Sequence, residues 1–207
     1  MAAMGTHVEI SATIIGHHLE RFTTLQRGLL LTALHTAGSM HNGQVRDDGY
    51  PYHTHVLSVH DYLLQIEWPA WAGIDIHLAA LLHDVLEDCP SANLNMLSDN
   101  FSPRLAAIVL SLTKLDKQRR FTQIVEAVSR GLWESIFVKL ADRLHNLSTI
   151  DGLEPRRITK KLHETLGPLV SCARECHPYL HSDLQPAFDE LLEEVVLLAR
   201  IKADIYC

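Results

Sequence analysis

The sequence predicts an all-α fold, a compact bundle of roughly eight or nine helices. Leucine is plentiful and aromatic residues make up only 6% of the chain, a composition that suits helices packed against helices. Apolar residues recur three and four positions apart in most segments, as on the buried face of a helix. No segment alternates polar and apolar residues over a useful length, so no strand is expected.

Capping residues and glycines divide the chain into the expected helices. Ser102 is a predicted N-cap followed by a proline in the first helical position, and Pro155 opens a later helix. Gly131 separates two helices, and Ser182 with Gln185 forms a predicted capping box for the last one. The expected helical ranges are 23–44, 55–66, 73–88, 103–113, 118–130, 132–151, 155–173 and 183–204.

Length and charge restrict the classes of partner. The chain of 207 residues has no internal repeat or long linker, so a single domain, 1–207, is expected. The formal net charge of −7 argues against broad binding to nucleic acid or to an anionic membrane. An anionic substrate is also harder to attract, unless a metal and local basic residues reverse the sign at the site. The oligomeric state is not indicated.

The sequence also suggests a compartment. The N-terminus carries no leader-like segment, and no apolar run is long enough to span a bilayer. Among the cysteines there is no second pair at zinc spacing, so we expect free thiols in a reducing cytoplasm. The cysteines are Cys89, Cys172, Cys176 and Cys207.

The segment LLHDVLEDCP, residues 81–90, places charged residues within an apolar run. Residues three and four apart share a helix face, so His83 lies over Glu87, and Asp84 lies over Glu87 and Asp88. Three carboxylates so close together repel one another and should not all stay ionised unaided. A bound cation is the simplest remedy; the alternative is a solvated face with an accidental run of charge.

A metal at this segment needs ligands from elsewhere, because divalent transition metals take four or more N and O donors. Asp142 is embedded in the apolar helical segment 137–150 and needs a partner there. A salt bridge to Lys139 or Arg143 would by itself explain this acid. The upstream segment PYHTHVLSVHDYL offers His53, His55 and His60.

The order His, then His-Asp, then Asp resembles the signature of the HD metal-dependent phosphohydrolase superfamily. The neighbouring residues are similar to the RelA/SpoT-type hydrolase domain, with its GQxRxxGxPYxxHP and HDxxEDT motifs, over about 28–170. The synthetase half of that family has no room here, so the chain resembles a stand-alone small alarmone hydrolase with an HD-domain bundle. The matching segments are GQVRDDGYPYHTH (43–55), HDVLEDC (83–89), LTKL (112–115), KLADRLHNLST (139–149) and RRITKKLHETLGPLV (156–170).

The resemblance implies removal of the 3′-pyrophosphate from (p)ppGpp with Mn²⁺, so the expected partner is a small-molecule nucleotide. Fe²⁺, Co²⁺ and Zn²⁺ also suit two histidines and two carboxylates. By the same resemblance the metal ligands are His55, His83, Asp84 and Asp142. The catalytic acids are Glu87 and Asp88, whose individual roles the sequence does not separate. The residues that shape the nucleotide pocket are Arg46, Asn146 and Thr149.

Three positions depart from the family pattern. Asp47 stands where the family commonly has Lys, Val56 where it has Pro, and Ser148 where it has Arg. We expect these changes to alter the rim where base and phosphates lie, so (p)ppGpp and (p)ppApp are both candidate substrates. The alternatives are another HD phosphatase acting on a nucleotide or NADPH, and a non-catalytic nucleotide-binding domain.

Three features beside the motifs are not assigned to the metal site. The basic segment TKLDKQRR (113–120) is either a phosphate-steering lip or an ordinary solvated loop. His53 is not expected to bind the metal, because only His55 has the family's distance from Arg46. His41 and His145 lie beside the motifs and are not assigned as ligands.

Overall fold

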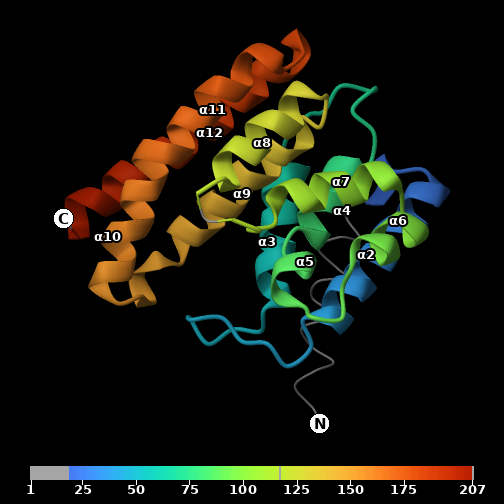
Figure 1. The fold of residues 1–207 in the computed structure, drawn as a ribbon, viewed down its shortest axis with the longest axis horizontal. Helices are drawn as coiled ribbons and strands as arrows, with labels where there is room; N and C mark the ends of the chain where they lie inside the picture. Colours follow the sequence, from blue (N-terminus) through green and yellow to red (C-terminus); the bar gives the residue numbers. More distant parts are fainter. Residues whose placement is uncertain (1–18, 117, 207) are drawn as a thin grey trace.

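The computed structural model describes residues 19–116 and 118–206, so Lys117 and Cys207 lie outside the described residues. The described residues form helices and turns without a β-strand, and one isolated bridge pairs Val45 with Pro51. The predicted all-α fold class is confirmed (Figure 1).

The helices follow the expected order with additional breaks. His83 and Asp84 separate α4 from α5, and a π-helical segment, Thr165–Leu169, joins α10 to α11. Counting each of these pairs as one helix gives nine helices within the described residues. The α-helices are α2 (Thr24–Met40), α3 (His53–Leu64), α4 (Asp75–Leu82), α5 (Val85–Asp88), α6 (Leu94–Asn100), α7 (Pro103–Leu112), α8 (Arg120–Ser129), α9 (Glu134–Ser148), α10 (Pro155–Glu164), α11 (Val170–Cys176) and α12 (Gln185–Tyr206).

Local chemistry sets several helix boundaries. The Ser102 hydroxyl accepts a hydrogen bond from the Leu105 main-chain N–H at 3.0 Å, so the predicted N-cap of α7 is present. Gly131 has φ +88°, a left-handed conformation that glycine adopts without a steric penalty, and it turns the chain from α8 into α9. Pro155 is the first residue of α10, as expected.

Two expected boundaries are wrong. The range 73–88 is not one continuous helix, because the chain leaves regular helical geometry at His83 and Asp84. Ser182 does not cap α12 but begins a 3₁₀ turn, Ser182–Leu184, after which α12 starts. In that turn the side chain of His181 accepts from the Asp183 main-chain N–H at 3.3 Å.

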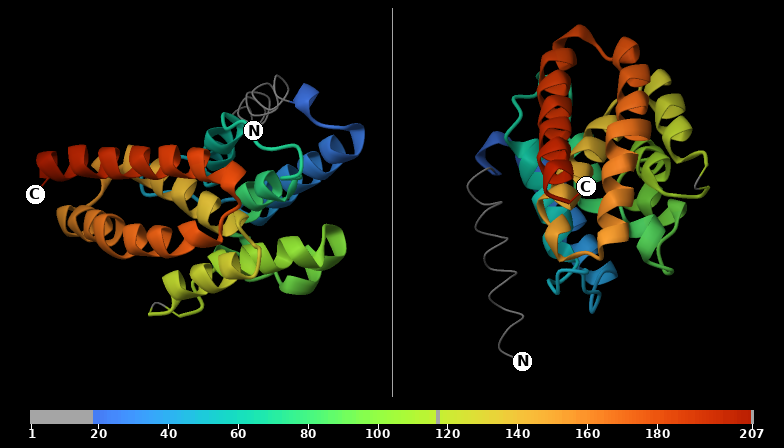
Figure 2. Two further views of the ribbon diagram at one scale, coloured as in Figure 1. Left: turned by 90° about the horizontal axis from the view of Figure 1, so that it is seen from above. Right: turned by 90° about the vertical axis from the view of Figure 1, so that its left-hand side faces the viewer.

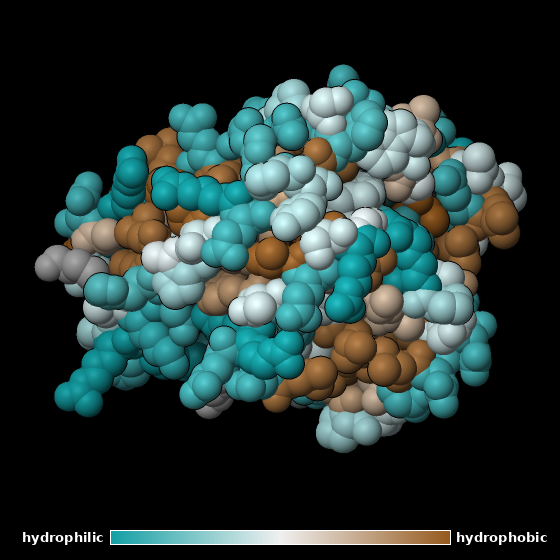
Figure 3. Space-filling view, turned by 45° about the horizontal axis from the view of Figure 1, so that its top comes forward, coloured by the Kyte–Doolittle hydropathy of each residue, from teal (hydrophilic) through white to brown (hydrophobic). Residues whose placement is uncertain are grey.

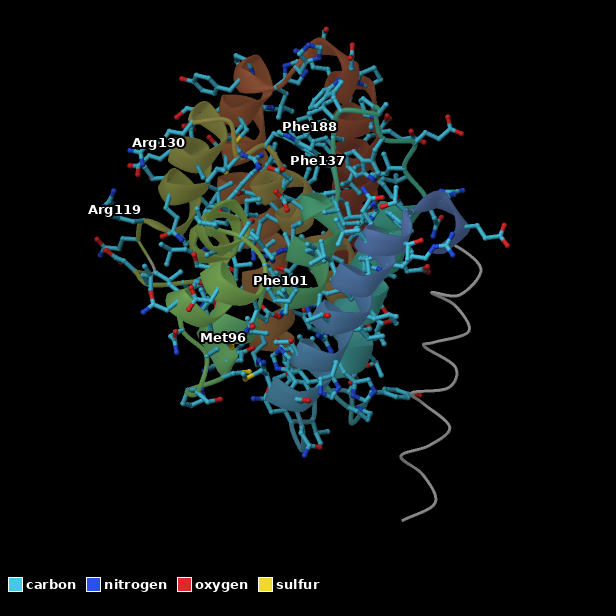
Figure 4. The ribbon with its side chains drawn as sticks, turned by 90° about the vertical axis from the view of Figure 1, so that its right-hand side faces the viewer. Met96, Phe101, Arg119, Arg130, Phe137 and Phe188 are labelled. Carbon is cyan, nitrogen blue, oxygen red and sulfur yellow. The ribbon has the colours of Figure 1, made fainter. Side chains whose placement is uncertain are left out.

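Helix α9 lies at the centre of the bundle. It packs against α3, α4, α7, α8 and α12, and eleven of its fifteen residues are buried. Phe137 of α9 contacts Phe188 of α12 edge to face with ring centroids 5.6 Å apart, and the two residues are labelled next to each other in Figure 4. A central helix so thoroughly enclosed can hold a polar side chain such as Asp142 in a fixed position.

The C-terminal helices form a second layer beside α9. Figure 2 shows α12 lying along α10 and α11, and α10 also packs directly on α12. The π-helical segment contains Pro168, which cannot donate the regular helical hydrogen bond and is accommodated by the wider turn. This arrangement brings α10 next to the C-terminal end of α9.

The surface is mixed in character. The face drawn in Figure 3 is mostly hydrophilic, with hydrophobic side chains gathered in smaller groups. Within 19–116 and 118–206, no helix combines the length and hydropathy that crossing a membrane requires.

Candidate active site

Two histidines and an aspartate meet where α3, α4 and α5 join. His55 comes from the first turn of α3, and His83 and Asp84 from the break between α4 and α5. His55 Nε2 is 3.4 Å from Asp84 Oδ2, and His83 Nε2 is 3.0 Å from the same oxygen. Donor atoms of the three residues lie within 4.8 Å of one another, close enough to hold one metal ion.

Asp142 approaches this group from α9. Its Oδ1 is 3.3 Å from His55 Nε2, while its Oδ2 accepts a hydrogen bond from Lys139 Nζ at 2.7 Å. The salt bridge considered from sequence therefore exists with Lys139, and Arg143 instead bonds to the Lys161 carbonyl oxygen. One oxygen of Asp142 is held by Lys139 and the other faces the histidines.

The break between α4 and α5 orients His83. Its Nδ1 is 2.8 Å from the carbonyl oxygen of Ala80, so Nε2 points toward the site. This Nε2 atom is buried and has no hydrogen-bond partner among the described residues, although the Asp84 carboxylate lies nearby. A buried nitrogen left without a hydrogen bond is costly, and a metal ion at this position would satisfy it.

His55 is held by a neighbour that the sequence left unassigned. His55 Nδ1 and His145 Nδ1 are 2.8 Å apart, so one of them carries the hydrogen between them. Burial, with the charge of His55 acting in the same direction, lowers the pKa of His145 to about 4 and keeps it neutral at pH 7. A hydrogen on His55 Nδ1 would make the Nε2 electron pair available to a metal ion held beside Asp84 and Asp142.

The charges of the buried candidate ligands favour the binding of a cation. Burial would raise the pKa of Asp84, but the charge of His83 and a hydrogen bond from His55 hold it well below its usual range. Burial likewise opposes ionisation of Asp142, whose pKa is held low by Lys139 and the same histidines. The pKa of His83 is raised to about 9 against the effect of burial, mainly by Asp84. A metal ion could take the place of that proton, so the donor set fits a divalent metal.

The two predicted catalytic acids have different partners. Glu87 Oε1 is 2.5 Å from Lys114 Nζ, and Glu87 Oε2 accepts from the Lys114 main-chain N–H at 3.1 Å. Asp88 Oδ2 lies 2.7 Å from the Tyr52 hydroxyl, whose oxygen is also 2.6 Å from Asp84 Oδ2. The pKa of Asp88 is raised, chiefly by burial.

The three predicted nucleotide-pocket residues also come together. A guanidinium nitrogen of Arg46 donates to Asn146 Oδ1 and to Thr149 Oγ1, each at 3.3 Å. Asn146 Nδ2 hydrogen-bonds Asp142, which links this group to the candidate metal ligands. Gly49, with φ +84°, turns the loop that carries Arg46 over the site.

The departures from the family pattern lie in different environments. Asp47 forms a two-point ion pair with Arg157 of α10, at 2.9 and 2.7 Å, so its negative charge is matched. Val56 is fully buried in the core, so the expectation that it alters the rim is wrong. The exposed Ser148 hydroxyl donates to the His145 carbonyl oxygen at 2.8 Å.

A cleft of about 900 Å³ connects these groups. It includes His55, Asp84 and Asp142 at one end, with Glu87 and Asp88 beside them. The sequence did not predict its basic wall, because these residues come from separate segments and α10 carries no recognised motif. The basic lining residues are Arg46, Lys114, Arg120, Lys139, Arg143, Arg157, Lys160 and Lys161.

Only part of the basic segment 113–120 belongs to this wall. Lys114 and Arg120 line the cleft, whereas Arg119 pairs with Glu126 at 3.1 Å. Arg119 projects from the edge of the molecule in Figure 4. Of the described residues in this segment, two cationic side chains line the cleft.

Comparisons with known proteins found a matching family model and similar proteins. The HD domain family model matches residues 33–167. A guanosine-3′,5′-bis(diphosphate) 3′-pyrophosphohydrolase of Haemophilus influenzae is 32% identical over 183 residues, covering 79% of this chain and 26% of that protein. The bifunctional (p)ppGpp synthase/hydrolase SpoT of Escherichia coli K12 is 33% identical, covering 65% of this chain and 20% of that protein. The chain thus spans about a quarter or less of the length of these curated relatives.

A solved structure has the same fold. It is described as a metazoan ortholog of SpoT that hydrolyzes ppGpp and plays a role in starvation responses. The TM-score is 0.59 at 24% identity, with 80% of this chain and 94% of the other covered. The RelA/SpoT-type resemblance is confirmed by the named relatives, and an HD hydrolase domain implies a divalent metal, for which His55, His83 and Asp84 form a candidate site. Because the family model matches well over half of the residues, the chain belongs to the HD domain family.

Proposed function

We propose that this chain is a metal-dependent hydrolase that removes the 3′-pyrophosphate from a nucleotide alarmone, (p)ppGpp or (p)ppApp. The products would be GDP or GTP, or the adenosine equivalents, together with pyrophosphate. The observation that carries the proposal is a single cleft lined by candidate metal ligands, two acids and the group around Arg46. The names of the relatives support the same activity.

We propose His55, His83, Asp84 and Asp142 as the metal ligands. Their mixture of two imidazoles and two carboxylates suits Mn²⁺, and Fe²⁺, Co²⁺ or Zn²⁺ are further candidates. A divalent metal held there would lower the pKa of a water molecule and so supply the attacking nucleophile. Lys139 keeps Asp142 ionised and fixed through its 2.7 Å contact.

The residues around the metal site have separate tasks in this proposal. Water attacks the phosphorus bonded to the ribose 3′ oxygen, the bond from phosphorus to that oxygen breaks, and the 3′ oxygen gains a proton. Glu87 and Asp88 accept the proton from water and supply the one to the leaving oxygen, help that is typically worth about 10²–10⁴ in rate. Arg46, Asn146 and Thr149 hold the nucleotide, and the guanidinium plane of Arg46 suits stacking on a base.

The test is product identification with several nucleotides. The protein with Mn²⁺ is incubated separately with ppGpp, pppGpp, ppApp and NADPH, and Asp84→Asn serves as the control without a complete ligand set. Release of pyrophosphate from an alarmone is the expected result, and the relative rates identify the base. Release of orthophosphate from NADPH alone would assign a different phosphatase activity. Tight nucleotide binding without any product would indicate a non-catalytic domain.

A further inference from the structure

We infer that Asp47 is an internal competitor for the 5′ phosphates of the nucleotide: its carboxylate occupies the guanidinium of Arg157, and a bound 5′ phosphate takes its place there. Asp47 thereby sets how strongly phosphorylated 5′ ends bind. This inference rests on the proposed function for the orientation of the nucleotide. Its binding part, the exchange of a carboxylate for a phosphate, is measurable without turnover.

The Asp47 side chain extends from a closed turn. The Arg46 main-chain N–H donates to the Tyr50 carbonyl oxygen at 2.9 Å, and the Gly49 N–H donates to the Arg46 carbonyl oxygen at 3.0 Å. Asp48 is tied into the same turn, because its Oδ1 accepts from the Tyr50 main-chain N–H at 3.1 Å. Of the two neighbouring acids, Asp47 is therefore the one that reaches across to another helix.

The partner of Asp47 comes from α10. Arg157 lies in the first turn of this helix, where its main-chain N–H donates to the Glu154 carbonyl oxygen at 2.8 Å. Its two terminal nitrogens donate to the two carboxylate oxygens of Asp47, at 2.9 and 2.7 Å. Both residues line the cleft, and their side chains are 52% and 53% exposed. Solutes in the cleft therefore have access to this ion pair.

A phosphate is well suited to replace the carboxylate. Asp47 is ionised, because its hydrogen bonds from Arg157 lower the pKa of its carboxyl. An ion pair so exposed contributes little to folding, so its loss is tolerated. The planar fork of a guanidinium binds two oxygens of a phosphate as it binds two oxygens of a carboxylate. A terminal phosphate carries a charge of about −1.5 to −2 at pH 7, more than a carboxylate, so the exchange strengthens the attraction to Arg157.

The ion pair lies on the side of the cleft that the 5′ phosphates would reach. Arg46 donates to Asn146, which hydrogen-bonds Asp142, so the proposed nucleoside-binding group faces the candidate metal ligands. The next residue, Asp47, instead contacts Arg157 of α10. A nucleotide held at Arg46 with its 3′-pyrophosphate at the metal therefore extends its 5′ phosphates toward α10. A 5′ end without phosphate would leave the ion pair intact.

The first experiment measures the binding of reaction products. Calorimetry of the Mn²⁺-loaded protein at pH 7.5 gives the Kd of GDP and ADP, with guanosine and adenosine as controls without phosphate. For the diphosphate of the preferred base, Asp47→Asn should lower Kd by about two- to fivefold, the effect of one exposed ion pair. The nucleosides should bind as in wild type. Asp151→Asn is the matched control, since this acid is also half exposed and ion-paired, with Lys202 Nζ at 2.6 Å, and does not line the cleft.

A double variant separates competition from general repulsion. Arg157→Met should weaken binding of the diphosphate, and adding Asp47→Asn to it should restore little, because no guanidinium is left to compete for. An equal gain from Asp47→Asn with and without Arg157 would mean that the acid repels phosphates from a distance. A Kd that rises in Asp47→Asn would mean that the ion pair supports the loop. Either result, or an unchanged Kd, would overturn the inference. Circular dichroism checks that the variants fold.

The second experiment tests the same exchange during turnover. KM and kcat are measured for alarmones with one, two and three 5′ phosphates and for an analogue with a 5′ hydroxyl. Asp47→Asn should lower KM for the phosphorylated substrates and leave kcat unchanged, because the phosphate contact is made in ground state and transition state alike. Asp47→Lys should lower KM further, since it adds a cation. An equal fall in KM for the 5′-hydroxyl analogue would contradict the inference. The expected Kd pattern without alarmone hydrolysis would contradict the proposed function alone.

Discussion

Lys161 offers a sharp test of the basic wall of the cleft. This half-buried lysine on α10 lines the cleft beside Arg143 and Arg157. Burial, followed by the positive charge of Arg143, lowers its pKa to about 8. A bound nucleotide would bring several negative charges to this wall and favour the protonated lysine. Substrate binding should therefore weaken as pH rises through about 8.

The size of the effect follows from this pKa. If only the protonated form of Lys161 binds the phosphates, KM is inversely proportional to the fraction of Lys161 that is protonated. With a pKa of about 8, KM should rise about eightfold between pH 7.5 and pH 9. Terminal phosphates, with a pKa near 6, are already ionised over this interval and add little to the change.

The assay is KM for the alarmone at half-unit steps from pH 7.5 to pH 9. Lys161→Met should show a higher KM at pH 7.5 and little further rise. Lys160→Met is the matched control, since Lys160 is the preceding residue and also lines the cleft, and it should keep the wild-type rise. Calorimetry in buffers of different ionisation enthalpy should detect proton uptake on binding near pH 8. A wild-type KM that is flat with pH, or a rise of equal size in Lys161→Met, would refute the reasoning.

Three further predictions concern single residues. Asp142→Asn should reduce metal content and activity together while the helical circular dichroism signal stays largely intact; full activity after chelation and Mn²⁺ repletion would reject the ligand assignment. His55→Ala should be severe and His53→Ala mild in metal stoichiometry and kcat, and the reverse order would mean that the loop is misregistered. His77 is buried, and burial lowers its pKa in the folded state to about 4, so stability is present above pH 6.5 and is lost as pH falls toward 4. Between pH 7 and pH 5 the free energy of unfolding by urea should fall by about 2 kcal/mol in chelated samples, and this fall should be absent from His77→Phe.

The sequence predicted the parts of the site that depend on short spacing. The residues of the HDVLED segment lie within two helical turns of one another, and those of the Arg46 loop are close in the sequence. The local sequence pattern therefore predicts which of these side chains lie together. The fold class followed for the same reason, since amphipathic spacing is local. The break at His83 and Asp84 was not predicted, because the segment from 74 to 88 contains no glycine or proline.

Features that depend on packing between distant segments were missed. Lys161 reaches the cleft only because α10 lies against the end of α9, and its sequence neighbours resemble an ordinary charged helix face. Tyr52 was visible within the PYxxH motif, but its hydroxyl contacts Asp84 and Asp88, which lie more than thirty residues away in the sequence. The contact between His55 and His145 spans ninety residues. A local sequence pattern cannot predict contacts between residues that lie so far apart in the sequence.

The distribution of charge reconciles an acidic protein with the anionic substrate that we propose. The whole chain carries a formal charge of −7, yet among the described residues the cleft is lined by eight lysines and arginines against six aspartates and glutamates. A divalent metal beside Asp84 would make the local balance more positive. Phosphates would then meet a positive cleft, while the acidic remainder of the surface would repel other polyanions such as nucleic acid. The positive charge inside the cleft thus favours phosphate binding there. The net negative charge of the chain acts on partners that cannot enter the cleft.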